Sequence, residues 1–340
     1  MNDNWVLQQI RKASLHQLIW WGGVLVCLLL FVLSQHRYIT NFFQGPFTFG
    51  KGELDAISDA SAEPRYFARV TGVKAIDTGI RQITVRKRAG VETSRSVSGE
   101  YFVLVIEDRL LVVKGSGGPH TTSEGELIPM RGELESRLFG TTEMQAIKKR
   151  FYPFYVDEES FRLPGYIAGA VIAVIGFFAV WLGIAPLKQY LAPSTHPVAQ
   201  RLASWGDPAR SAAGIEQESR APRQTRRPWR ITDNYLIQSA FFAFDLHRLA
   251  DLQWAYKRVT SSNTAKGYAA VLMLSDGKVE IGGPEKDVDA VLNSAAERVP
   301  WAVFGYSKEI EEHFNKNRPG FAGSVEQRRR DWTQQAGATP

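Results

Sequence analysis

Two long apolar runs interrupt a chain whose other segments mix hydrophobic and polar positions. The first run covers residues 18–33 and the second covers residues 163–185, and neither contains a charged residue. A helix needs about 20 mostly apolar residues to cross the hydrocarbon core of a bilayer. The second run meets that length alone, and the first meets it when flanking polar residues lie in the headgroup layer. We therefore predict transmembrane helices over residues 18–35 and 163–185.

Aromatic side chains at the ends of both runs support this prediction, because Trp and Tyr are enriched where a membrane meets water. These residues are Trp20, Trp21, Tyr38, Tyr152, Tyr155 and Tyr166. Two buried core helices are the alternative, but no other part of the chain is apolar enough to enclose them. The first run is long for a signal peptide, and no small-residue cleavage site follows it. We therefore expect an uncleaved anchor.

Residues 36–162 contain short strand-like runs separated by turn signals. In the strongest of them, residues 101–113, two β-branched runs flank Glu107 and Asp108, which is the pattern of a tight hairpin. Roughly five such runs at regular spacing predict a small barrel or sandwich. A helical stretch over residues 142–156 is predicted to lead into the second apolar run.

The sequence after the second run divides into a linker, a compact unit and a tail. Residues 186–228 are rich in Pro, Ser, Ala and Arg and are predicted to form a basic linker, with one short helix over residues 196–206. Residues 229–315 begin with three strand-like pieces and continue with a hairpin at Asp276-Gly277, which favours a type I′ turn. An amphipathic helix follows the hairpin, and another short helix is expected over residues 307–317. Residues 316–340 form a polar tail that is expected to be frayed.

The segment 229–315 resembles a pleckstrin-homology-like module of the kind attached to bacterial membrane proteins. Its strands, its Asp-Gly hairpin and the helix after the sheet carry the likeness, in the phrases ITDNYLI, LADLQWAYK, LSDGKVEIGG and VDAVLNSAAERVPW. An obvious Lys/Arg cluster in an early hairpin is lacking, so the resemblance does not imply phosphoinositide binding. The whole chain resembles two-pass bacterial membrane proteins of unassigned function, which implies an architecture and no activity.

The formal net charge of +6 is carried by the ends of the chain. The segment between the apolar runs holds 18 basic and 17 acidic residues, whereas the segment after the second run holds 21 and 17. Because cytoplasmic flanks carry an excess of Lys and Arg, we predict that both termini are cytoplasmic, as in a bacterial inner membrane. The predicted fold class is a membrane α+β protein. Residues 1–17 are then a cytoplasmic segment, 36–162 an extracytoplasmic β-rich domain and 229–315 a cytoplasmic PH-like domain.

The sequence contains no pattern typical of a metal, cofactor or nucleotide site. Its six histidines are scattered without H-E-x-x-H, its single cysteine, Cys27, lies in the first apolar run, and G-x-S-x-G is absent. We therefore predict no catalytic residue, metal ligand or cofactor. His247 lies near Asp245 and Asp251, for which a surface pair is the simpler interpretation.

Two groups of residues are candidates for an interaction site. The first is a set of arginines that follow the second apolar run closely enough to contact acidic lipid headgroups: Arg223, Arg226, Arg227 and Arg230. A solvated linker that fixes the topology is the alternative. The second group, His120 and Glu124, lies in a loop whose residue types suit acyl transfer but are also the usual composition of an exposed loop.

Three functional hypotheses follow from these features. The first is a non-catalytic scaffold or interaction protein that links an extracytoplasmic domain to a cytoplasmic one through unidentified protein partners. The second is an accessory or catalytic subunit of an envelope enzyme that acts around Arg109, His120 and Glu124. The third is a membrane-lipid binding module. Gly169 and Ala173 have the small-residue spacing of packed membrane helices, which suggests a homo-oligomer, and no nucleic-acid partner is expected.

Overall fold

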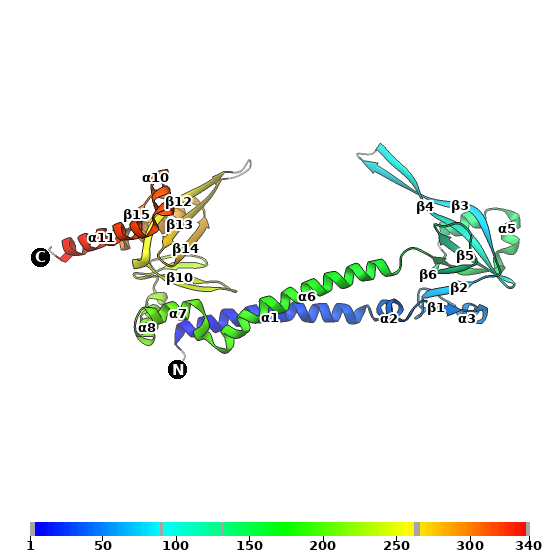
Figure 1. The fold of residues 1–340 in the computed structure, drawn as a ribbon, viewed down its shortest axis with the longest axis horizontal. Helices are drawn as coiled ribbons and strands as arrows, with labels where there is room; N and C mark the ends of the chain where they lie inside the picture. The colour runs from blue at the N-terminus through cyan, green and yellow to red at the C-terminus, as the bar shows by residue number, and fades with distance from the viewer. Residues whose placement is uncertain (1–3, 89–90, 131, 262–265, 338–340) are drawn as a thin grey trace. The chain divides into compact units, whose positions relative to one another are not determined.

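The structure is a computed structural model that describes residues 4–88, 91–130, 132–261 and 266–337. Its architecture is mixed α+β, as the sequence predicted (Figure 1). The chain divides into two units. We call residues 1–23 together with 179–340 the terminal unit, and residues 24–178 the central unit.

The two apolar runs lie within two helices of 30 residues each, α1 (Trp5–Ser34) and α6 (Arg162–Leu191). Both helices are long and apolar enough to cross a membrane. In their most apolar 18-residue windows, 0% of α1 and 6% of α6 is buried by protein. A core helix would be mostly buried, so the described chain contradicts the alternative of two core helices.

The central unit is built on one sheet of seven strands in the order β1-β2-β6-β7-β5-β4-β3. The strands are β1 (Phe47–Phe49), β2 (Phe67–Thr71), β3 (Lys74–Arg88), β4 (Val91–Ile106), β5 (Arg109–Gly115), β6 (Thr122–Pro129) and β7 (Phe151–Asp157). Neighbours are antiparallel except for the parallel pairs β1–β2 and β5–β7. Since β1 and β3 are open edges, the prediction of a small barrel or sandwich is wrong.

Helices cover both faces of this sheet, which explains why the prediction of a barrel or sandwich is wrong. Phe102 and Leu104 of β4 enter one core, and Val103 between them enters a second core. The first core includes residues of α2 (His36–Gln44) and α3 (Lys51–Ala56), and the second includes residues of α4 (Gly132–Leu138) and α5 (Thr142–Ile147). Strands that are buried on both faces form continuous apolar runs. The helices take the place that a second sheet would have in a sandwich.

The stretch before α6 also differs from its prediction. The helix α5 ends at Ile147, a 3₁₀ turn, η1 (Lys148–Arg150), follows, and the next residues form β7 between β5 and β6. The Phe and Tyr side chains of β7 favour a strand, and pairing on both sides decides the outcome. The hairpin predicted at Glu107 and Asp108 is confirmed, with Ile106 paired to Arg109.

The terminal unit contains two four-stranded sheets, ordered β11-β10-β9-β8 and β14-β13-β12-β15. The strands are β8 (Gln224–Arg226), β9 (Trp229–Ile231), β10 (Tyr235–Ser239), β11 (Phe244–Arg248), β12 (Leu252–Ser261), β13 (Lys266–Leu274), β14 (Gly277–Gly283) and β15 (Val303–Phe304). Two antiparallel meanders therefore follow each other, and β15 adds to β12 in parallel. Four strands, β9–β12, occupy the stretch where three were predicted.

The amphipathic helix predicted after the hairpin is confirmed as α9 (Glu285–Arg298), which buries Val288, Val291 and Ala295 in the core of the two sheets. The hairpin itself turns at Ser275 and Asp276. Neither residue is among the described residues with positive φ, whereas a type I′ turn needs positive φ at both central positions. The expected type I′ turn is therefore wrong.

Helices also occupy the segments that were predicted to be a linker and a frayed tail. In the linker they are α7 (Pro197–Ser204), which confirms the short helix expected there, and α8 (Pro208–Arg220), with a 3₁₀ turn η2 (Pro193–Thr195) before them. In the tail the helix is α11 (Arg318–Gly337). The short helix expected before the tail is confirmed as α10 (Lys308–Lys316), and a 3₁₀ turn η3 (Leu249–Asp251) precedes β12. Asp207 caps α8 by accepting a hydrogen bond from the Ala209 amide at 3.0 Å, and Pro208 takes the first helical position. The helix α11 buries Phe321 and Val325 against Trp254.

The first turns of α1 pack inside the terminal unit. Val6, Leu7 and Ile10 are buried against residues of α7, α8 and the β10–β11 hairpin. The described part of segment 1–17 is therefore a piece of the folded core of this unit, although it is more than 170 residues away from α7 in sequence.

Candidate functional site

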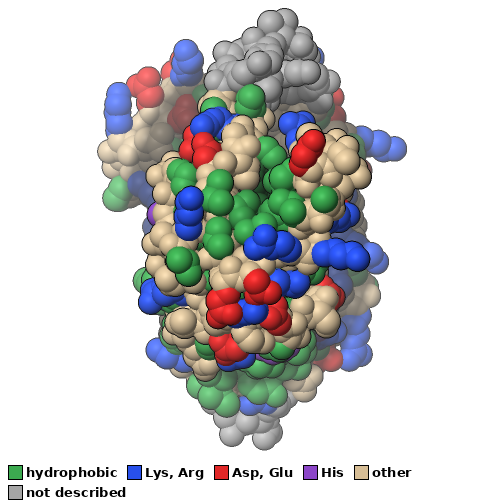
Figure 2. Space-filling view, turned by 90° about the vertical axis from the view of Figure 1, so that its right-hand side faces the viewer, with side chains coloured by type: hydrophobic (Ala, Val, Ile, Leu, Met, Phe, Trp, Pro, Cys, Tyr) green, Lys and Arg blue, Asp and Glu red, His purple; other side chains and the backbone are tan. Residues whose placement is uncertain are grey.

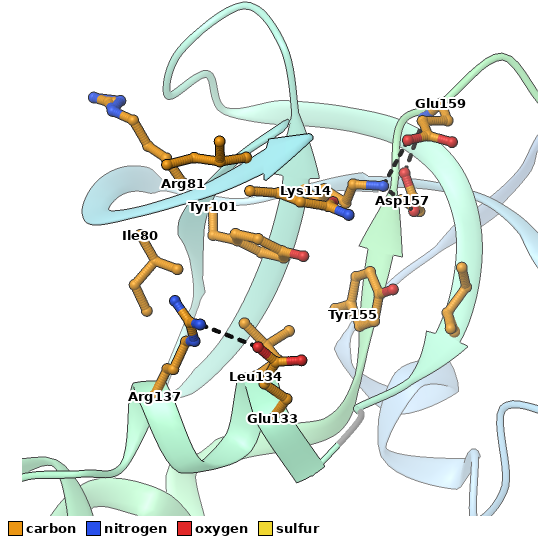
Figure 3. Close-up of a pocket in the computed structure, with 13 residues that line it drawn as sticks. Ile80, Arg81, Tyr101, Lys114, Glu133, Leu134, Arg137, Tyr155, Asp157 and Glu159 are labelled. Atoms are coloured by element: carbon orange, nitrogen blue, oxygen red, sulfur yellow. Dashed lines mark hydrogen bonds and ion pairs between the residues drawn. The ribbon is translucent and has the colours of Figure 1, made fainter. Parts of the chain in front are cut away.

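The central unit contains a cleft of about 660 Å³ between the sheet and α4. Its lining residues are Ile80, Arg81, Gln82, Ile83, Tyr101, Lys114, Ile128, Glu133, Leu134, Arg137, Tyr155, Asp157 and Glu159. Figure 3 shows the rings of Tyr101 and Tyr155 between an ion pair on α4 and a second ion pair at Lys114. A space of this size holds a small molecule or a few side chains of a bound segment.

Lys114, on β5, is the charged centre of one end of the cleft. Its side chain is only 8% exposed, and its Nζ donates to Asp157 Oδ2 at 2.9 Å and to Glu159 Oε1 at 2.7 Å. Burial is the largest influence on the ammonium and opposes its charge, but the hydrogen bonds to Glu159 and Asp157 outweigh it and raise the pKa of Lys114. The lysine therefore stays positively charged at neutral pH.

The register of the sheet places this ion pair. Lys114 stands opposite Asp157 in the parallel pairing of β5 with β7, so the two charges meet without any loop. The neighbouring strand contributes Gly99, where a Cβ would come within 3.0 Å of the lysine Cε. Gly99 thus leaves room for the apolar stem of the lysine under the cleft. Sequence inspection missed the pair because its two residues are 43 positions apart.

The other end of the cleft carries two exposed arginines. Arg137 binds Glu133 one helical turn away at 3.1 Å and is 62% exposed. Arg81 binds Glu100 of the next strand at 2.8 Å and is 41% exposed. At the Lys114 end, Glu159 is 72% exposed. The cleft thus has solvent-accessible arginines at one end, an accessible carboxylate at the other and tyrosine rings between them.

The surface of the central unit also exposes hydrophobic side chains. Figure 2 shows the unit end-on, with hydrophobic side chains gathered in a hollowed area and Lys, Arg, Asp and Glu around them. Along the β3–β4 hairpin, Ile76 is 46% exposed, Ile83 is 50% exposed and Val97 is 56% exposed. Apolar surface rimmed by charge is the usual composition of a protein-binding patch.

The residues predicted for a catalytic site are not joined by any contact that the structure describes. His120 Nε2 lies 2.7 Å from Glu158 Oε1. Burial is the largest influence and opposes the charge of His120, but the hydrogen bonds to Glu158 and to the Gly118 backbone, together with the charge of Glu158, outweigh it and raise the pKa of His120. Glu124 instead pairs with Arg69 at 2.7 Å on the adjacent strand. Arg109 pairs with Asp55 at 3.4 Å. Each candidate therefore has a separate partner.

The four arginines predicted to contact lipid headgroups separate into two pairs. Arg223 binds Asp233 at 3.0 Å, and Arg226 lies 3.3 Å from Asp287. Arg227 and Arg230, at the β8–β9 hairpin, form no ion pair with any residue that the structure describes. Only the second pair is left with its charge uncompensated.

A polar network in the terminal unit joins three elements that are distant in sequence. His247 of β11 has a side chain that is 6% exposed and lies 3.0 Å from Asp276 at the β13–β14 turn. Arg201 of α7 binds Asp245 at 2.5 Å and Asp276 at 2.8 Å. His247 also pairs with Asp245, at 3.3 Å. The pair is not on the surface as predicted, because α7 and the turn cover the face of β11 on which Asp245 and His247 lie.

This network shifts the titration of Asp245. Burial is the largest influence and opposes the carboxylate charge, but the hydrogen bond and charge of His247, together with the charge of Arg201, lower the pKa of Asp245 to about 2. The four side chains satisfy one another and hold α7 against the sheet. Within the described residues, no group of three or more His, Cys, Asp and Glu side chains is arranged to hold a metal ion.

Replacing Lys114 by Met is expected to destabilise the central unit by about 3 to 5 kcal/mol, because Asp157, which is 11% exposed, loses its partner. Pulse proteolysis of the full-length protein in detergent, over a urea series, measures the change. Lys148→Met is the matched control, since it removes an ion pair to Glu135 whose side chains are 52% and 40% exposed. The control should lose less than about 1 kcal/mol. Equal losses in both variants would contradict the importance of the buried pair.

The lowered pKa of Asp245 predicts an acid-sensitive terminal unit. This carboxyl titrates at 3.8 in its unperturbed state and at about 2 in the folded unit, so its contribution is complete above about pH 4 and is lost as the pH falls towards 2. The side chain is 33% exposed. With allowance for solvent screening, we expect a loss of about 1 to 2 kcal/mol over this interval.

Asp245→Asn should show this loss already at pH 7 and a flatter stability curve between pH 4 and pH 2. Tryptophan fluorescence during urea unfolding measures it selectively, because all nine tryptophans lie outside residues 24–178. Glu297→Gln, which changes an exposed carboxylate on α9, serves as the control and should keep the wild-type curve. A wild-type slope in Asp245→Asn would rule out this origin of the acid sensitivity.

Comparison of the chain with family models, with curated proteins and with solved structures finds no match. A functional assignment therefore rests on three structural features: the geometry of the cleft, the exposed helices and the uncompensated arginines.

Proposed function

We propose that the chain is a two-pass integral membrane protein that binds a partner at its central unit and links it to the terminal unit across the bilayer. The observation that carries the proposal is the exposure of α1 and α6, whose apolar windows are 0% and 6% buried. Removing apolar surface from water is worth roughly 25 cal/mol per Å². Lipid is the environment that covers two uncharged helical surfaces of this length.

The terminal unit contains both the first residues of the chain and the residues that follow α6, which supports an even number of membrane crossings. Residues 1–23 fold with residues 179–340, so both ends of the chain belong on one side of the membrane. The central unit, residues 24–178, then lies on the other side. Val6 and Ile10 are fully buried in the terminal unit, which favours an uncleaved α1, because cleavage would remove part of a core.

The cytoplasm is the compartment that we infer for both termini. The excess of Lys and Arg lies after α6, and such an excess marks the cytoplasmic side of a bacterial inner membrane. The order of elements supports the resemblance of residues 229–315 to a PH-like module, since two antiparallel meanders are followed by α9. In this proposal the terminal unit is the cytoplasmic interaction module.

The cleft around Lys114 is the surface that we assign to the extracytoplasmic partner. Its exposed arginines and the accessible carboxylate of Glu159 suit a segment that carries both charge signs, and its tyrosine rings suit an apolar side chain between them. We therefore infer a protein partner, and the central unit works as a binding domain. This form of the scaffold hypothesis needs no reacting group.

The topology has a direct test in Cys27→Ser protein that carries one new cysteine. Ser116→Cys, in an exposed loop of the central unit, should react with an impermeant maleimide on intact cells. Ser275→Cys, at the exposed β13–β14 turn, should react only after the membrane is opened. The protein should also stay in the membrane fraction at alkaline pH. Release at alkaline pH, or labelling of both cysteines from outside, would refute the proposed topology.

Partner binding has its own test, a photocrosslinking amino acid at position 83. Ile83 lines the cleft and is 50% exposed, and Val73 is an exposed apolar control in the same unit, at 81%. Crosslinking in intact cells should give discrete protein adducts from position 83 and none from position 73. Arg137→Glu should weaken the adduct about tenfold, equivalent to about 1.4 kcal/mol. Equal adducts from both positions would show that the cleft has no specific role.

A further inference from the structure

The turn between β10 and β11 presents two phenylalanines at its tip. The Ala240 amide donates to the Ala243 carbonyl at 2.9 Å and closes the turn. Phe241 is 64% exposed and Phe242 is 41% exposed. The terminal unit therefore covers these two aromatic side chains only in part, and apolar surface of this kind is typical of a site that contacts a membrane or a partner.

Helix α1 holds this turn at the point where its apolar run begins. His16 stacks on Phe241 with ring centroids 4.0 Å apart, and its Nδ1 lies 2.8 Å from the Phe241 carbonyl oxygen. Gln17 donates to the Phe242 carbonyl, and the ring of Trp20 meets that of Phe242 at 5.9 Å. Trp20 lies two residues inside the apolar run, or about 3 Å along the helix axis. The tip of the turn is therefore level with the start of α1's apolar run.

Two hollows flank the turn and share Ser239, Ala240 and Phe241. One, of about 450 Å³, lies against α1 and is lined also by Lys12 and His16. The other, of about 560 Å³, lies against the β8–β9 hairpin and is lined also by Arg227 and Arg230.

A backbone hydrogen bond fixes the second hollow, since the Ser239 amide donates to the Pro228 carbonyl at 2.9 Å. The first hollow thus combines Lys12 with the ring of Phe241, and the second combines Arg227 and Arg230 with the same ring.

The positive charge around the turn is not neutralised by the protein. None of the residues that line either hollow is acidic, in contrast to the cleft at Lys114. Lys12, Arg227 and Arg230 form no ion pair with a residue that the structure describes. Cations beside exposed aromatics, at the level where a helix enters a bilayer, match the charge and depth of acidic phospholipid headgroups.

We propose that the β10–β11 turn inserts Phe241 and Phe242 into the headgroup region beside α1, and that Lys12, Arg227 and Arg230 bind acidic phospholipid there. The inference rests on the proposed membrane insertion of α1. The terminal unit is thereby held against the bilayer by a second attachment in addition to its helices. This attachment restricts the tilt of the unit, because the turn adds a membrane contact to those of α1 and α6.

The test places an environment-sensitive fluorophore on Phe241→Cys in Cys27→Ser protein reconstituted in nanodiscs. Val259→Cys, at an exposed apolar position of β12 (52% exposed), is the matched control. The label at position 241 should emit at shorter wavelength and be quenched by headgroup-level spin-labelled lipid, and the label at 259 should do neither. Water-like emission at 241, in protein that resists alkaline extraction, overturns the inference and leaves the proposed function standing. Release by alkali overturns both.

The lipid preference is measured as phosphatidylglycerol retained over phosphatidylcholine in mixed nanodiscs. Changing Lys12, Arg227 and Arg230 singly to Gln should lower the preference about fivefold for each cation. The double variant Arg223→Gln/Arg226→Gln removes the arginines that are already paired with Asp233 and Asp287, and should change the preference little. Added inorganic phosphate should not compete. An equal loss of lipid preference in the three single variants and in the double variant would exclude a lipid site at this turn. Competition by inorganic phosphate would exclude it as well.

Discussion

The uncovered apolar surface of α1 and α6 is the constraint on which the rest of the architecture depends. Two helices of 30 residues bury almost none of their apolar windows, and the lipid environment that we propose covers them without further protein. The helices are also the only chain connections between the terminal and central units. In the proposed topology, these helices therefore decide which compartment each unit meets. The cleft and the basic turn have a functional meaning only within that division.

The sequence predicted the features that depend on local periodicity. The apolar runs, the hairpin at Glu107 and Asp108 and the helix α9 follow from patterns that a few neighbouring residues set. The shape of the central sheet does not follow from such local patterns. Its second face can be covered either by helices or by another sheet, and the strand pattern is the same in both cases. The helices α8 and α11 were missed for a related reason. Their stability comes from packing a few apolar residues, such as Ile215 and Phe321, against distant elements.

The candidate sites depend even more strongly on contacts between residues that are distant in sequence. Lys114 and Asp157 are ordinary residues in sequence, and only the parallel register of β5 with β7 makes them a buried pair. The predicted arginines divided because Asp233 and Asp287, which no motif connects to them, neutralise two of the four. Sequence patterns identify residues whose side chains are able to bind a ligand. Pairing decides which of those residues stays available to a ligand, and pairing is a property of the folded chain.

The first turns of α1 share one core with residues that follow α6, and this has a consequence for how the protein is made. Val6, Leu7 and Ile10 emerge first from the ribosome, and their partners on α7, α8 and the β10–β11 hairpin follow only after both apolar helices. During that interval the first turns of α1 have no core to enter. The terminal unit therefore completes its fold only after α6 and the elements that follow it have been made, and a chain that is arrested earlier leaves the apolar face of Val6, Leu7 and Ile10 without its core.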